Sequence, residues 1–284
     1  MQILIKISDE NTPLTKPILG YPRFNASKDK TYLIVGGLGG LGLEFTDWLI
    51  IHGARNLVIV SRNGIRTGYQ RMKVETWKHY GINVSILSGM DATKLEDCEY
   101  ILRTAEKQAP VDGIFNLAGL LRDGFIVNQT VESFEEVVKS KATTAKNLDV
   151  LSRKICPKLR HFVVFSSIAC GRGNNGQSNY AFGNGVMERI CERRVEEGFP
   201  GMAVQWGMIK DVGLAVKILK NKQVINGTMA QSIPSFLEEL EKFLCQSRPI
   251  VSSYVIANKQ GNVKEVANVL EAVMNIMSKY NSTA

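Results

Sequence analysis

Four side chains in the middle of the chain have types and spacing suited to carbonyl reduction. Ser167 ends a short apolar run, and Tyr180 and Asn184 follow at helical i, i+4 spacing, so the latter two share one helix face. Reducing a ketone requires an acid that delivers a proton as the oxyanion forms. A tyrosine, with an ordinary pKa of about 10, serves at neutral pH only if a cation stabilises its phenolate. Lys141, in the preceding predicted helix, is the candidate cation, and Ser167 is the candidate hydrogen-bond donor to the substrate oxygen.

Taken singly, each of these residues also has a structural interpretation. Tyr180 could be a packed helix aromatic, Lys141 a solvated lysine and Ser167 a turn residue at a strand end. Their joint spacing with the glycine-rich loop described next favours the chemical interpretation.

A second motif predicts a dinucleotide site. Gly36-Gly37-Leu38-Gly39-Gly40-Leu41-Gly42 follows a β-branched run and opens a helical pattern, the context of a pyrophosphate-binding turn. The next strand ends at Ser61-Arg62 without the acidic residue that favours NAD, and an arginine can bind a 2′-phosphate, so the predicted cofactor is NADPH. The remaining expected cofactor contacts lie just past the third strand and at the end of the fourth: Asp91, Ala92, Asn116, Leu117, Ala118 and Gly119.

The elements that must position these residues alternate between strand and helix. Strands are predicted at 31–35, 56–60, 83–88, 113–118, 161–166, 201–205 and 250–255. Helices are predicted between them at 41–53, 69–80, 94–108, 131–154, 178–197 and 234–246. This alternation predicts a Rossmann-type α/β fold, a doubly wound parallel sheet with helices on both faces.

Composition limits the class of protein. With 44% hydrophobic and 22% charged residues in 284, the chain is of the globular class, and no apolar run is long enough for a membrane span. The net charge of +8 fits phosphorylated cofactors or an acidic carrier, and the scattered basic residues argue against nucleic acid. The five cysteines show no metal-binding spacing, so we expect reduced thiols, a cytoplasmic location and no metal site.

Several segments of the chain resemble the ketoreductase domain of animal fatty acid synthase and, more broadly, modular polyketide ketoreductases of the short-chain dehydrogenase/reductase superfamily. They are YLIVGGLGGLGLEF, SRNGIRTGYQ, IFNLAGLLRDG, FSSIACGRGNNGQSNY and VQWGMIKDVG. The resemblance implies an NADPH-dependent 3-oxoacyl-[acyl-carrier-protein] reductase that acts in fatty acid synthesis on a carrier- or CoA-bound thioester, beside other synthase domains.

The resemblance also implies roles for particular residues. The family replaces the usual Tyr-x-x-x-Lys by Tyr-x-x-x-Asn, here Tyr180 and Asn184, and takes its lysine from the preceding helix, at Lys141 rather than Lys139. Asp123 and Gln177 are expected to orient the substrate, and Asp123 indicates the D-3-hydroxy product.

The domain boundaries follow from the same resemblance. Residues 1–30 are expected to be a linker or edge segment from a preceding domain, 31–259 the ketoreductase with a lid at about 211–232, and 260–284 a linker toward a carrier domain. Two alternatives remain open: a catalytically silent NADPH-binding scaffold module, and a free-standing reductase of another carbonyl.

Overall fold

The computed structural model describes residues 20, 22–210, 212, 224–225 and 227–257. Its centre is a seven-stranded parallel sheet in the order β3-β2-β1-β4-β5-β6-β9. The strands are β1 (Thr31–Val35), β2 (Asn56–Ser61), β3 (Asn83–Ser88), β4 (Val111–Asn116), β5 (His161–Ser167), β6 (Met202–Trp206) and β9 (Ile250–Ser253). The predicted doubly wound sheet is confirmed.

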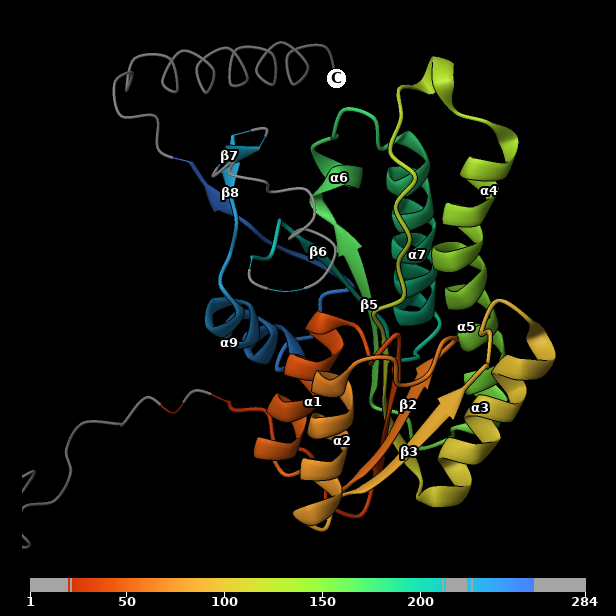
Figure 1. Cartoon of the computed structure of the whole chain (residues 1–284), viewed down its shortest axis with the longest axis vertical. Coiled ribbons are helices and arrows are strands. Elements are labelled where there is room, and N and C mark those ends of the chain that lie inside the picture. Colours follow the sequence, from red (N-terminus) through yellow and green to blue (C-terminus); the bar gives the residue numbers. More distant parts are fainter. Residues whose placement is uncertain (1–19, 21, 211, 213–223, 226, 258–284) are drawn as a thin grey trace, which may run out of the picture.

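Helices cover both faces of the sheet (Figure 1). One face carries α1 (Gly40–Ile51), α2 (Gly68–His79) and α9 (Ile233–Leu244), and the other carries α3 (Leu95–Gln108), α5 (Thr144–Ile155) and α7 (Ser178–Glu196). Strand side chains alternate between two apolar cores: Ile34 packs under α1, whereas Leu33 packs under α3 and α5. Because both faces are covered, β1 is buried at every position, which explains its continuous apolar sequence.

The segment predicted as one helix at 131–154 is three pieces. It consists of α4 (Val131–Val138), a π-helical turn (Lys139–Thr143) and α5. The turn buries three consecutive residues, Ser140, Lys141 and Ala142. In a regular α-helix, three consecutive residues point in different directions and do not share one buried face. The wider π turn therefore brings Lys141 into the protein.

The strand predicted at 250–255 is two strands in the structure, β9 at 250–253 and β10 (Val255–Ile256), and β10 belongs to a second, smaller sheet. Several other element ends shift by one or two residues. β4 runs from 111 to 116 rather than from 113 to 118, because the side-chain oxygen of Asn116 accepts a hydrogen bond from the Ala118 amide at 3.2 Å and turns the chain out of the sheet. A short helix, α6 (Ile168–Gly171), directly follows β5.

A small second sheet, in the order β10-β8-β7, lies beside the main one. It is formed by β7 (Val224–Ile225), β8 (Thr228–Met229) and β10 (Val255–Ile256). The expected end segments fall largely outside the described residues (1–19, 21 and 258–284), as does most of the expected lid (211, 213–223 and 226). In the part of the chain that the structure describes, no helix is both long and apolar enough to cross a bilayer.

Candidate active site

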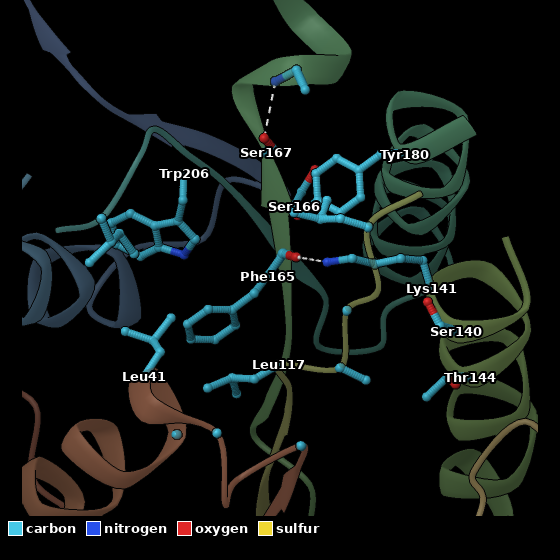
Figure 2. Close-up of a pocket in the computed structure, with 18 of the residues that line it drawn as sticks. Leu41, Leu117, Ser140, Lys141, Thr144, Phe165, Ser166, Ser167, Tyr180 and Trp206 are labelled. Carbon is cyan, nitrogen blue, oxygen red and sulfur yellow. Dashed lines mark hydrogen bonds between the residues drawn. The ribbon is translucent and has the colours of Figure 1, made fainter. Parts of the chain in front are cut away.

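A cavity of about 860 Å³ lies at the carboxyl ends of the central strands (Figure 2). The strand order of the parallel sheet reverses between β1 and β4, and ligands of open α/β sheets bind at such a switch point. The cavity brings together most of the predicted site: Gly36, Gly39, Gly40, Leu41, Gly42, Ser61, Arg62, Asp91, Ala92, Leu117, Ala118, Gly119, Asp123, Lys141, Ser167, Gln177 and Tyr180. Gly37, Leu38, Asn116 and Asn184 are not among its lining residues.

The glycine-rich loop passes from β1 into α1 through contacts that leave no room for side chains. Gly36 has φ +81°, and a Cβ there would lie 3.1 Å from the Ala118 amide nitrogen. A Cβ on Gly42 would lie 2.5 Å from the carbonyl oxygen of Gly37. The backbone therefore lies open to the cavity at the start of α1, whose first turn contains no acidic side chain. Free amides at a helix N-terminus bind anions such as a pyrophosphate.

The end of β2 presents an arginine to the same cavity. Arg62 is exposed and makes no hydrogen bond or ion pair with any other described residue. Asp91, after β3, is held in a turn, where its side chain accepts a hydrogen bond from the Thr93 amide at 3.0 Å. An unpaired guanidinium beside a pyrophosphate site can bind a further phosphate.

Three elements converge on Tyr180 (Figure 2). Tyr180 lies on α7, and the Nζ atom of Lys141 lies 5.1 Å from the centre of its ring. Lys141 is 3% exposed and donates a hydrogen bond of 2.8 Å to the carbonyl oxygen of Phe165 on β5. The neighbouring Lys139 instead pairs with Glu135 on the outer face. A buried ammonium next to a phenol can stabilise the phenolate.

The other two predicted catalytic residues, Ser167 and Asn184, each make one hydrogen bond to the backbone. Ser167 Oγ accepts a hydrogen bond from the Ala169 amide at 3.1 Å, so its own hydroxyl hydrogen remains available to a ligand. Asn184 Nδ2 donates to the Tyr180 carbonyl oxygen at 2.9 Å. Asn184 Oδ1 is buried without a partner among the described residues, a costly arrangement unless a ligand or water supplies a donor.

The predicted substrate-orienting residues contact each other. Gln177 Nε2 donates to Asp123 Oδ2 at 3.0 Å. This bond joins the β4–α4 loop (residues 117–130) to the segment that precedes α7.

A buried carboxylate behind the site was missed by sequence reasoning. Glu188 is 5% exposed, and its Oε1 accepts hydrogen bonds from Ser166 Oγ at 2.5 Å, Cys170 Sγ at 2.6 Å and Gln205 Nε2 at 3.0 Å. Burial of Cys170, together with its bond to Glu188, raises the pKa of this thiol to about 11. The sequence signal was the position of Glu188, one helical turn beyond Asn184 and two beyond Tyr180. The described residues contain no cluster of three or more potential metal ligands.

Comparison with known proteins identifies the family. Residues 30–211 match the KR domain family. The chain is 33% identical over 230 residues to the reducing polyketide synthase DEP5 of Alternaria brassicicola, covering 80% of this chain and 10% of that protein. It is 32% identical over 232 residues to the highly reducing polyketide synthase pspA of Penicillium soppii, covering 79% of this chain and 9% of that protein.

Solved structures agree with these relatives. An A-type ketoreductase from a modular polyketide synthase superposes with a TM-score of 0.75 at 26% identity, over 83% of this chain and 49% of that one. The first ketoreductase of the tylosin polyketide synthase gives a TM-score of 0.73 at 27% identity, over 84% of this chain and 51% of that one. This chain thus spans about half of those solved chains and about a tenth of the fungal synthases. It belongs to the KR domain family, in the form found in polyketide synthases.

Proposed function

We propose that the chain reduces 3-oxoacyl thioesters with NADPH and forms the D-3-hydroxyacyl product. The observation that carries this proposal is the convergence of Tyr180, Lys141 and Ser167 on one cavity with the glycine-rich loop. A proton donor, a cation and a hydroxyl beside a dinucleotide-type loop are the groups that ketone reduction requires.

The residues fit two parts of the cofactor, its pyrophosphate and its 2′-phosphate. At Gly36 and Gly42 a Cβ would collide with neighbouring backbone, so both positions require glycine. Because these positions carry no side chain, a pyrophosphate can approach the loop backbone closely. Arg62 is available for the 2′-phosphate that distinguishes NADPH from NADH, and no carboxylate at the end of β2 opposes it. When bound, NADPH supplies the hydride.

The chain's own residues supply the proton and hold the ketone. The Tyr180 hydroxyl donates its proton to the substrate oxygen, and the Lys141 ammonium, 5.1 Å from the ring centre, stabilises the phenolate left behind. The Ser167 hydroxyl donates a hydrogen bond to the same oxygen; its contact with the Ala169 amide uses an acceptor lone pair and leaves the hydroxyl hydrogen for the substrate. The bond from Lys141 to the Phe165 carbonyl ties the cation to the strand that ends in Ser167.

The metabolic context is a choice between two kinds of synthase. The segments FSSIACGRGNNGQSNY and IRTGYQ favour a fatty acid synthase, whereas the relatives named above are reducing polyketide synthases. Both would present the 3-oxoacyl group on an acyl carrier protein, for which CoA thioesters are the soluble equivalent. The five cysteines are free thiols, which supports a reducing, cytoplasmic compartment.

The test is NADPH oxidation by the purified protein with acetoacetyl-CoA. Oxidation should depend on the ketone, be faster with NADPH than with NADH, and be lost in Tyr180→Phe, which should still bind NADPH. NADPH binding without ketone-dependent oxidation would support the silent scaffold instead. Turnover of steroid, sugar or quinone carbonyls in preference to the thioester would support the free-standing reductase.

A further inference from the structure

The β4–α4 loop, which carries Asp123 into the cavity, has little apolar burial to hold it in place. Its central residues Phe125, Ile126 and Val127 are 66%, 73% and 86% exposed. Figure 1 shows the loop rising beside α7 before it enters α4. Since hydrophobic stabilisation scales with the area removed from water, polar contacts must fix the loop in its observed position.

Those polar contacts centre on two amide side chains, Asn179 and Gln129, which we call the amide clasp. Asn179 Nδ2 donates to the Arg122 carbonyl oxygen at 2.9 Å and to Gln129 Oε1 at 3.0 Å. Gln129 Nε2 donates to the carbonyl oxygens of Arg122 at 2.9 Å and Gly124 at 3.1 Å. The clasp therefore grips the backbone on both sides of Asp123.

The clasp is also joined directly to the residue that delivers the proton. Asn179 Oδ1 accepts a hydrogen bond of 2.7 Å from the backbone amide of Tyr180. Asn179 is 0% exposed, so water cannot readily replace its bonds, whereas Asp123 is exposed and its bond to Gln177 competes with solvent. One buried amide thus couples the position of the Asp123 loop to the start of α7.

We propose that Asn179 and Gln129 are positioning residues that fix which face of the ketone the site presents for reduction. This inference rests on the proposed function. The glycine-rich loop fixes the cofactor, so the product configuration depends on how the opposite wall orients the substrate. That wall is formed by the Asp123 loop and the 174–180 segment, which are held together by the clasp and by a backbone hydrogen bond of 2.8 Å from the Gly124 amide to the Gly176 carbonyl oxygen.

Asn179→Asp separates this role from simple capping of α7. The variant keeps an oxygen that accepts from the Tyr180 amide but loses both N–H donors of the Asn179 amide group. Its second carboxylate oxygen then faces the Arg122 carbonyl oxygen and Gln129 Oε1, which also only accept hydrogen bonds. The minor 3-hydroxy enantiomer should rise about tenfold, the size expected when buried hydrogen bonds are lost, while the KM for NADPH stays within about twofold. Gln129→Met, which removes only the loop side of the clasp, should raise the minor enantiomer by the same factor.

Asn128→Asp is the matched control. It makes the same chemical change in the same loop, at an exposed residue outside the clasp, and should keep wild-type enantiomeric purity. If the wild type turns over and Asn179→Asp gives wild-type purity, the proposal is wrong.

Hydrogen exchange of residues 121–131 tests the clasp without turnover. Exchange in Asn179→Asp should be about tenfold faster than in the wild type and in Asn128→Asp, at unchanged NADPH affinity. If the wild type reduces no ketone, the proposed function fails, and exchange then decides whether the clasp holds the loop. Unchanged exchange in that case overturns the clasp as well. If Asn179→Asp loses NADPH binding, it has misfolded. The same exchange measurement on Gln129→Met, which leaves α7 intact, then tests the clasp.

Discussion

Replacing Arg62 by alanine should selectively weaken the use of NADPH. Arg62 lines the cavity at the end of β2 and has no partner among the described residues, so its guanidinium is free to bind a 2′-phosphate with paired hydrogen bonds. Hydrogen bonds to charged groups contribute about 1.5–3 kcal/mol. Because Arg62 is exposed, solvent screening favours the lower value, about 1.5 kcal/mol, or roughly a tenfold loss.

The assay is kcat/KM for NADPH and for NADH with acetoacetyl-CoA, in wild type, Arg62→Ala and Arg66→Ala. Arg66 is an exposed arginine four residues further along that does not line the cavity, so its replacement removes the same charge without the proposed contact. The NADPH-to-NADH ratio should fall about tenfold in Arg62→Ala alone, by loss of NADPH use, and the difference should shrink as salt is added. Equal ratios in the two variants would refute the assignment, because only the net charge would then matter.

Three further predictions concern the framework of the site. Gly42→Ala should lower both the melting temperature and the NADPH affinity, because the new Cβ would lie 2.5 Å from the Gly37 carbonyl oxygen. Gly185→Ala is the control: a Cβ there would have no atom within 4 Å, so the melting temperature should be unchanged or higher. Burial of Asp112 disfavours its charged form, but the hydrogen bonds and positive charge of Arg160 outweigh this and hold the Asp112 pKa below 3.8. The ionised carboxylate therefore stabilises the fold above about pH 4, and this contribution is lost as the pH falls through the lowered pKa. Urea unfolding should therefore show Asp112→Asn less stable at pH 7, with the gap closing below about pH 4; a gap constant with pH would contradict this. Burial and the bond to Glu188 raise the pKa of Cys170 to about 11, so alkylation of this thiol should be slow at pH 8 and faster in Glu188→Gln. Mass spectrometry of the peptide that contains Cys170 measures the rate, and equal rates in the two proteins would argue against the bond to Glu188.

Local sequence features predicted the sheet and the glycine-rich turn from β1 into α1 well. The strands are short apolar runs between turn signals, and burial on both faces made them continuous enough to recognise, as at 31–35. The glycine-rich loop was equally accessible, since its conformation follows from contacts between near neighbours such as Gly37 and Gly42. These features are set by residues close together in the chain.

The contacts that shape the candidate active site join distant residues, and sequence reasoning did not find them. The π-helical turn that buries Lys141 looks like ordinary helix in the sequence, because the signal is three consecutive buried positions rather than any residue type. The clasp joins Gln129 to Asn179 across 50 positions, and the bonds of Glu188 reach back to Ser166 across 22. No periodicity encodes such pairs.

The position of Lys141 depends on helix packing rather than on a shared helix face. A lysine one turn after Tyr180 would need only the i, i+4 spacing of α7, but that position holds Asn184, fully buried. Lys141 must therefore approach from the neighbouring helix, and a Cβ on Gly183 would lie 3.2 Å from Lys141 Cβ, tighter than ordinary contact. The missing side chain at Gly183 and the π turn at Lys141 together allow the ammonium to reach the Tyr180 ring, so the chemistry of this site depends on the fit between α7 and the π-helical turn beside it.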